Sequence, residues 1–184
     1  MNLRNTTDRY GSLSIGMHWL MLLLLFAVYA VINLHDAAEK GSALRADLKT
    51  WHFMLGLAVL ALVAVRLATR FLSGPAPGIE PHIARWQQRG AGAIHVALYV
   101  FMIGMPLLGW LAVSAKGAPI VFFGAPLPML IGQDKALYDT LKDIHETVGT
   151  VGYFLIGLHA AAALFHHYVA RDNTLLRMLP LRGR

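Results

Sequence analysis

Four long runs of apolar residues alternate with polar segments along the chain. The runs cover residues 12–34, 51–72, 91–115 and 145–170, and each is long enough to cross a bilayer as one helix, which takes about 20 residues. The segments between the runs carry most of the proline and most of the charged residues. The pattern therefore predicts an all-α integral membrane four-helix bundle, folded as a single domain over residues 1–184.

The polar segments predict how the spans are joined. Residues 34–50 have mixed charge and predict a loop. Residues 73–90 predict a second loop because they are rich in proline, glycine and arginine. The polar stretch QDKALYDTLKD (residues 133–143) could form a short interfacial helix that leads into the fourth span. Pro106 lies past the middle of the third span and predicts a kink there.

Lysine and arginine are unevenly distributed about the four spans. The side that holds both termini and the second loop has ten Lys or Arg against three Asp or Glu, whereas the opposite side has six against seven. Because cytoplasmic loops carry the excess of Lys and Arg, both termini are predicted to be cytoplasmic. The ten basic residues are Arg4, Arg9, Arg66, Arg70, Arg85, Arg89, Arg171, Arg177, Arg182 and Arg184.

Composition narrows the chemistry. Only 14% of the residues are charged, against about 25% in soluble domains, which agrees with a membrane protein. The net charge of +6 is explained by the asymmetry about the membrane, so no nucleic-acid partner is predicted. The chain has no cysteine, which excludes disulfides, thiolate metal sites, iron–sulfur clusters and covalently attached haem. Any haem would be held non-covalently, by histidine or methionine.

The fourth span carries two histidines on nearly one face. His145 and His159 are 14 residues apart, a rise of about 21 Å and a rotation roughly 40° short of four turns. Ionisable side chains inside a span are costly and suggest a function, and neutral imidazole is an axial ligand of haem iron. The spacing predicts two stacked haems beside this helix. The alternative is a polar helix face whose histidines are hydrogen-bonded to neighbouring helices.

Histidines on the other spans match these two in depth. His52 begins the second span and is predicted at the outer surface with His145, and we call these two residues the outer pair. His18 lies in the inner leaflet with His159, and we call these two the inner pair. This matching across three helices favours haem ligation. His95 also falls in the inner leaflet, so depth alone leaves it as a rival ligand.

Several motifs resemble those of the bacterial cytochrome b561 family. They are SLSIGMHWL in the first span, WH at the start of the second, and KDIHET, GYFLIGLHAAAALFHHY and RDNTLLRMLP from Lys142 to Pro180. The resemblance implies two b-type haems in a four-helix bundle of the bacterial inner membrane. It also implies that His95 is not a ligand, and that the axial ligands are His18, His52, His145 and His159.

The resemblance implies electron transfer with membrane ubiquinone. The best-described relative is a superoxide oxidase, which passes electrons from periplasmic superoxide to ubiquinone, and this is the first reading of function. The second is a carrier between the quinol pool and a periplasmic redox partner, or the haem subunit of a larger dehydrogenase. A third is a transporter or structural bundle without haem, which a colourless protein would support.

Two further groups of residues are candidates for substrate contacts. Lys49 and Lys142 each lie three residues before an outer-pair histidine, so they could form a cationic mouth for superoxide, helped by Arg45 or Lys116. At the end of the fourth span, His166, His167 and Arg171 offer hydrogen-bond donors to a quinone or a haem propionate. The alternative is that both groups are ordinary surface residues.

Overall fold

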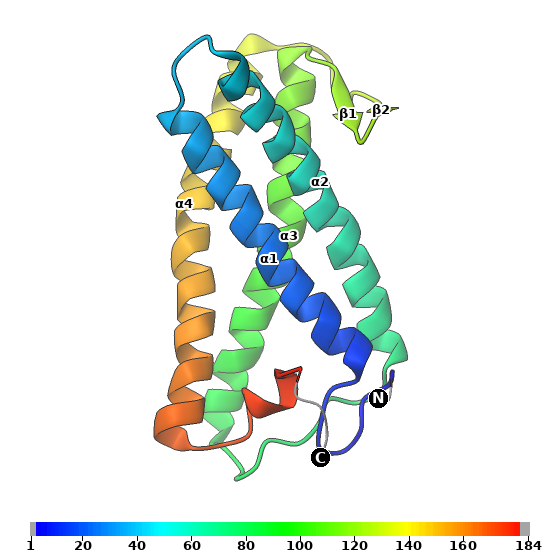
Figure 1. The fold of residues 1–184 in the computed structure, drawn as a ribbon, viewed down its shortest axis with the longest axis vertical. Helices are drawn as coiled ribbons and strands as arrows, with labels where there is room; N and C mark the ends of the chain where they lie inside the picture. The colour runs from blue at the N-terminus through cyan, green and yellow to red at the C-terminus, as the bar shows by residue number, and fades with distance from the viewer. Residues whose placement is uncertain (1–2, 181–184) are drawn as a thin grey trace. The chain divides into compact units, whose positions relative to one another are not determined.

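The computed structural model describes residues 3–180 and is built on four long helices (Figure 1). They are α1 (Ser12–Ala37), α2 (Ala43–Leu72), α3 (Arg85–Lys116) and α4 (Lys135–Phe165). All four are long and apolar enough to cross a membrane, which confirms the predicted all-α membrane-spanning four-helix bundle. Arg182 and Arg184, two of the basic residues counted above, lie outside the described residues.

Three of the helices begin earlier than the apolar runs, because polar caps set their first turns. α2 starts eight residues before its run, where Ser42 Oγ accepts a hydrogen bond from the Arg45 amide at 3.2 Å. α4 starts ten residues early, where Asp134 Oδ1 accepts from the Leu137 amide at 3.0 Å. The segment predicted as a separate interfacial helix is therefore the beginning of α4. The helix α3 continues through Pro106.

The loop predicted over residues 34–50 is reduced to residues 38–42. The Arg45 guanidinium donates to the carbonyls of His35 and Ala38, at 2.8 and 2.9 Å, and so caps the end of α1. Gly41 adopts a φ of 85°, a conformation that disfavours residues with a side chain. The predicted loop was too long because charged residues were assigned to it. In the structure these charged residues extend both helices beyond the apolar runs.

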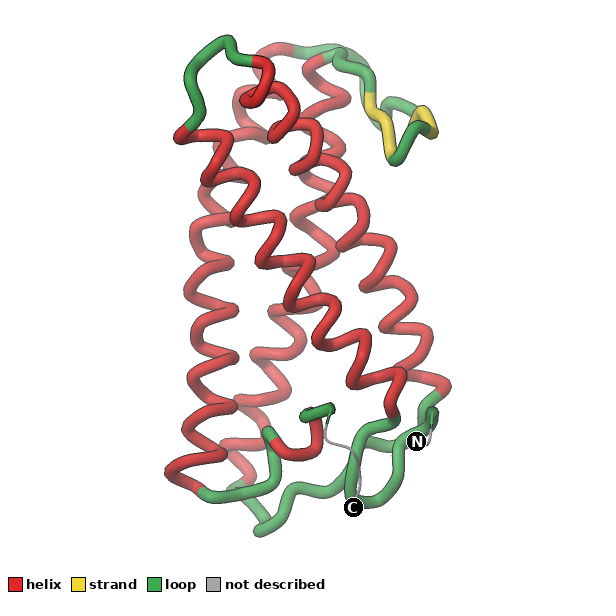
Figure 2. Tube along the Cα trace, in the orientation of Figure 1, coloured by secondary structure: helices red, strands yellow, loops and turns green. Residues whose placement is uncertain are grey.

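A small β-hairpin, absent from the prediction, lies between α3 and α4 (yellow in Figure 2). Strands β1 (Ile120–Phe122) and β2 (Ala125–Leu127) pair antiparallel, with Ile120 opposite Leu127. Phe123 and Gly124 both have positive φ, as a two-residue type I′ turn requires. Strands of three residues are too short to show the alternation that identifies a strand in sequence.

After α4 the chain turns sharply. A π-helical turn covers His166–Ala170, and Arg171 ends it in the left-handed conformation with its amide donating to the His166 carbonyl. A single 3-10 turn follows at Leu176–Met178. Trp19 Nε1 donates to the Met178 carbonyl at 2.7 Å, which fixes this terminal segment to α1.

By contacts, the chain divides into two compact units to which every long helix contributes. The inner unit comprises the described parts of residues 1–20, 64–100 and 152–184, and the outer unit comprises residues 21–63 and 101–151. The inner pair and His95 belong to the inner unit, and the outer pair belongs to the outer unit. Each histidine pair is therefore assembled inside one unit.

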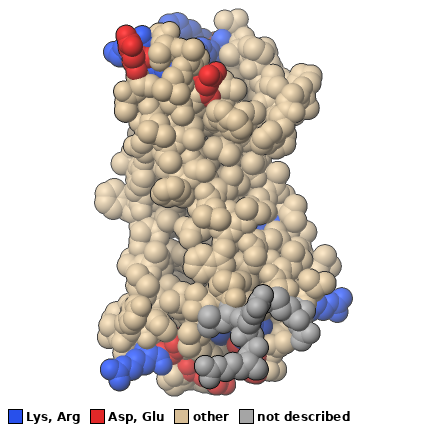
Figure 3. Space-filling view, viewed as in Figure 1, with Lys and Arg blue, Asp and Glu red and all other residues tan. Residues whose placement is uncertain are grey.

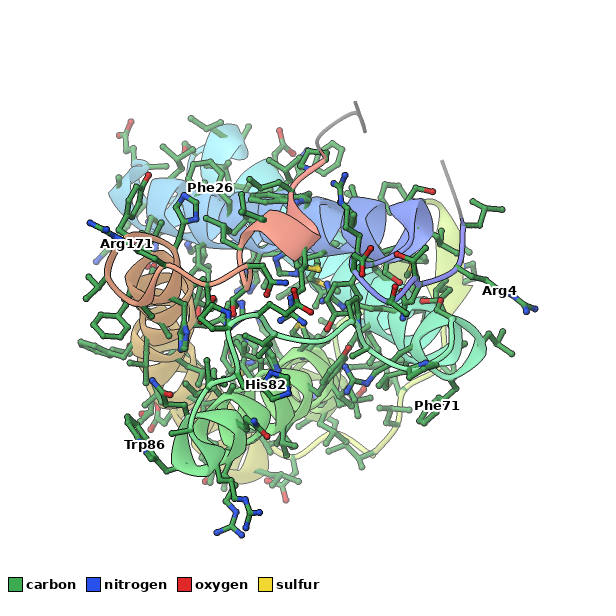
Figure 4. The ribbon with its side chains drawn as sticks, turned by 90° about the horizontal axis from the view of Figure 1, so that it is seen from below. Arg4, Phe26, Phe71, His82, Trp86 and Arg171 are labelled. Atoms are coloured by element: carbon green, nitrogen blue, oxygen red, sulfur yellow. The ribbon has the colours of Figure 1, made fainter. Side chains whose placement is uncertain are left out.

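The helix surfaces are those of a lipid-facing protein. Large apolar side chains such as Phe71 and Trp86 are 82% and 74% exposed, and both point outward in Figure 4, as does Arg4. Almost all of the charged side chains on the face drawn in Figure 3 gather near the ends of the helices. Apolar side chains on this scale are stable in hydrocarbon and costly in water, so the surface agrees with a multi-pass membrane protein.

Candidate functional site: two histidine pairs

The outer pair brings together imidazoles from α2 and α4. The ring centroids of His52 and His145 are 6.1 Å apart and their planes meet at 82°. Two imidazoles on opposite faces of one metal ion, each bonded at about 2 Å, place their ring centroids about 6 Å apart. His52 Nδ1 donates to the Val28 carbonyl at 3.4 Å, which leaves Nε2 free to act as a ligand.

The surroundings of the outer pair fit a bound macrocycle. His145 Nδ1 is buried and interacts with the Met105 backbone, which leaves Nε2 free to act as a ligand. A Cβ on Gly56 would meet nothing within 4 Å, so there is open space one turn from His52. Gly149 lies one turn from His145, and a Cβ there would be in van der Waals contact with the Met105 side chain at 3.5 Å.

Gly109 allows α3 to approach the outer pair closely. A Cβ at this position would lie 3.2 Å from His145 Cε1. We therefore expect Gly109→Ala to displace the imidazole. Such overpacking costs about 1 to 3 kcal/mol, so the outer site should bind haem roughly 5- to 150-fold more weakly, as measured by haem titration of the apoprotein.

Gly104→Ala is the matched control, because a Cβ there meets nothing within 4 Å on the same helix. Its haem affinity should equal that of the parent. Equal weakening by the two substitutions, or no weakening by Gly109→Ala, would show that α3 does not set the position of His145.

The inner pair has nearly the same spacing as the outer pair. The ring centroids of His18 on α1 and His159 on α4 are 6.2 Å apart, with planes at 65°. His95 on α3 joins them, with its ring centroid 5.4 Å from that of His159. The shorter distance is less suitable for two ligands on opposite faces of one iron, so the geometry favours His18 over His95 as the partner of His159.

Arg66 on α2 lies beside the inner pair. Its guanidinium donates to His18 Nδ1 at 3.1 Å in a partly buried environment. Arg66 and Arg70 both lie near the end of the second apolar run; Arg70 is exposed, but Arg66 turns toward the histidines. A basic residue inside an apolar run was the only sequence signal for this contact.

The three candidate quinone residues occupy different environments. His166 Nδ1 is 2.5 Å from Asp172 Oδ2, and the Asp172 side chain is only 1% exposed. The ring of His167 instead packs edge-on against Tyr168, with centroids 4.7 Å apart, and Arg171 is exposed (labelled in Figure 4). Only His166 is held in place by a buried carboxylate.

Asp172 was not identified from sequence as part of this site. Burial acts to raise the pKa of the Asp172 carboxyl, but hydrogen bonds from the Thr174 amide, at 2.8 Å, and from His166 outweigh it and lower the pKa below its usual value. The stabilisation from these bonds is therefore present above the ordinary carboxyl pKa and is lost only as the pH falls through the lowered value. The carboxylate is ionised at neutral pH.

The basic residues predicted to surround the outer pair lie close enough to interact electrostatically, but they differ in whether their charges are paired. Lys49 interacts with Lys116, Arg45 and Lys142. Lys142 Nζ is 2.7 Å from Glu146 Oε1, so its charge is largely paired. Arg45 is occupied by the carbonyls that end α1. Lys49 forms no ion pair with any residue in the described part of the chain, so it keeps its positive charge unpaired.

The sequence is similar to those of several known proteins. The sequence matches the family described as prokaryotic cytochrome b561 over residues 9–181. "Cytochrome b561 homolog 1" of Escherichia coli (strain K12) is 35% identical over 175 residues, covering 95% of this chain and 99% of that protein. "Probable superoxide oxidase CybB" of Yersinia pestis is 37% identical over 172 residues, covering 94% and 96%. "Cytochrome b562" of Cereibacter sphaeroides is 27% identical over 175 residues, covering 92% and 94%.

Proposed function

The chain belongs to the prokaryotic cytochrome b561 family, and so binds haem b and transfers electrons in a bacterial membrane, and on this premise we propose that it is a dihaem oxidoreductase that oxidises superoxide and reduces ubiquinone. In this proposal His52 and His145 ligate one haem, and His18 and His159 ligate the other. The two histidine pairs, spaced alike at 6.1 and 6.2 Å, carry the proposal.

The haems supply one-electron carriers that connect the two sides of the membrane. If two histidines held each haem as proposed, the haems would supply electron transfer without binding superoxide at the metal. Two superoxide anions each lose one electron and leave as dioxygen. One ubiquinone takes up those two electrons and two protons, and leaves as ubiquinol.

The charge distribution sets the direction proposed for this reaction. The excess of Lys and Arg on the side of the termini supports a cytoplasmic position for the inner pair and a periplasmic position for the outer pair. Superoxide would then arrive near Lys49, whose unpaired charge attracts an anion. Relatedness to a probable superoxide oxidase at 37% identity supports this choice of substrate.

Quinone would bind near His166. Nδ1 of this ring is hydrogen-bonded to Asp172, so the buried carboxylate fixes the orientation of the ring and Nε2 can donate a hydrogen bond to a quinone carbonyl. We expect His166→Ala to slow ubiquinone reduction by about 100-fold, the lower end of general acid–base effects. Asp172→Asn should slow it by a smaller factor, because the ring remains but loses its charge partner.

His167→Ala is the control for the quinone prediction, because that ring packs against Tyr168 and contacts no carboxylate in the described part of the chain. The reduced protein is mixed with a soluble ubiquinone analogue and haem oxidation is followed optically. A full rate in His166→Ala, with the haem spectrum of the parent, would place the quinone elsewhere.

The function itself is tested by stopped-flow mixing of the oxidised protein with superoxide. Rapid haem reduction, followed by reoxidation when ubiquinone is supplied, is the expected result. A protein that superoxide leaves oxidised, but that ubiquinol reduces, would instead be a carrier. The exposed hairpin favours that second function, since Val121 and Phe123 offer an apolar contact for a periplasmic partner.

A further inference from the structure

Arg66 is a cation with no matching anion. It lies six residues before the end of α2, inside a helix apolar enough to span the membrane, and it forms no ion pair with any described residue of the chain. Within residues 3–180, the hydrogen bond of its side chain is to His18. Because an unpaired charge in an apolar environment is costly, the position requires an anion that the polypeptide itself does not provide.

The contact with His18 also cannot persist unchanged when His18 binds iron. A neutral histidine that ligates through Nε2 carries its proton on Nδ1 and is a donor there. Arginine has five donors and no acceptor. Two donors therefore face each other at the site of the present 3.1 Å contact, and the guanidinium needs another acceptor close to the inner pair.

We propose that Arg66 is an anion-binding residue of the inner haem site, where it pairs with a carboxylate of the haem and raises the reduction potential of that haem. The inference rests on the proposed ligation of this haem by His18 and His159. Haem b carries two propionate groups, and a planar guanidinium is well suited to bind a carboxylate through two parallel hydrogen bonds.

The effect on potential follows from charge. Reduction adds one electron to the iron and forms or breaks no covalent bond. A fixed positive charge stabilises the more negative, reduced state, and its influence is strong where water is scarce. Arg66 is near enough to interact electrostatically with His18, His95 and His159. It therefore favours electrons on the inner haem, the carrier proposed to supply the quinone.

The test compares Arg66→Gln, Arg66→Lys and the control Arg70→Gln in the purified full-length protein. Arg70 lies one turn further along α2, carries the same charge and is exposed. In an optical redox titration, Arg66→Gln should lower the ratio of reduced to oxidised inner haem about tenfold at a fixed potential, equivalent to about 59 mV. The outer haem should not shift. Arg66→Lys and Arg70→Gln should stay close to the parent.

A second measurement asks whether the partner is the haem carboxylate. Apoprotein of the parent and of Arg66→Gln is titrated with haem b and with its dimethyl ester, which lacks both carboxylates. Arg66→Gln should weaken binding of haem b at the inner site and leave binding of the ester unchanged. Equal weakening for both would overturn the carboxylate assignment and point to another anion, such as a lipid phosphate.

The remaining outcomes also decide the proposal. Loss of the inner haem in Arg66→Gln but not in Arg66→Lys supports it, because Lys keeps the positive charge that Gln removes. Loss in both variants, or an unchanged inner potential in Arg66→Gln, contradicts it. A parent protein without haem at the inner site would refute the proposed function instead, before any variant is compared.

Discussion

Replacing His52 or His145 with alanine should reduce the haem content from two per chain to one and leave the inner haem spectrally intact. Replacing His18 or His159 should remove the other haem. The reason is that each pair is assembled within one unit, with rings 6.1 and 6.2 Å apart. Haem per chain is measured with the pyridine haemochrome assay, together with the spectrum of the haem that remains.

His95→Ala is the control for ligation, because its ring is only 5.4 Å from that of His159 and is not expected to bind the iron. This variant should keep two haems. Loss of a haem from it would make His95 the inner ligand in place of His18. If His18→Ala and His52→Ala disturb the same haem, the proposed pairing of ligands is wrong.

Reversing the charge of Lys49 should slow reduction of the oxidised protein by superoxide by about tenfold or more, since focused charge changes encounter rates by factors of about 10 to 10³. Lys142→Glu should have a smaller effect, because Glu146 already pairs with that lysine. Added salt should also slow the parent, because charges further apart than about 8 to 10 Å are screened at physiological ionic strength. Stopped-flow absorbance gives the rates.

Lys40→Glu provides the matched control for steering. Lys40 is exposed in the loop between α1 and α2, and it is not among the charges that act on Lys49. Its reversal should change the rate little. If neither Lys49→Glu nor added salt changes the rate of reduction by superoxide, the anion is not steered by charge and a protein donor is favoured.

The four spans, and the meeting of the four histidines in two pairs, could be predicted because their signals in the sequence are local. About 20 apolar residues identify a span, and residue counting alone converts the separation of His145 and His159 into depth. The comparisons confirm the family that the motifs indicated. The helix starts could not be placed this way, because they depend on single caps such as Ser42 and Asp134, which sit among other polar residues.

Contacts between distant parts of the chain could not be predicted from the sequence. Arg66 and His18 are 48 residues apart, and either a snorkelling or an inward-facing side chain satisfies the same apolar pattern. Gly109 and His145 meet only because α3 and α4 pack closely there. Asp172 follows a π-helical turn that folds it back onto His166, and no periodicity predicts such a turn.

The central claim is that each histidine pair binds one haem b. It is tested most directly by the haem-to-protein ratio of the purified full-length chain, supplied with excess haem and freed of unbound pigment. Two b-type haems per chain, both with the low-spin spectrum of iron held by two histidines, is the result expected. One haem per chain, or two haems of which one has an open coordination position, would contradict it.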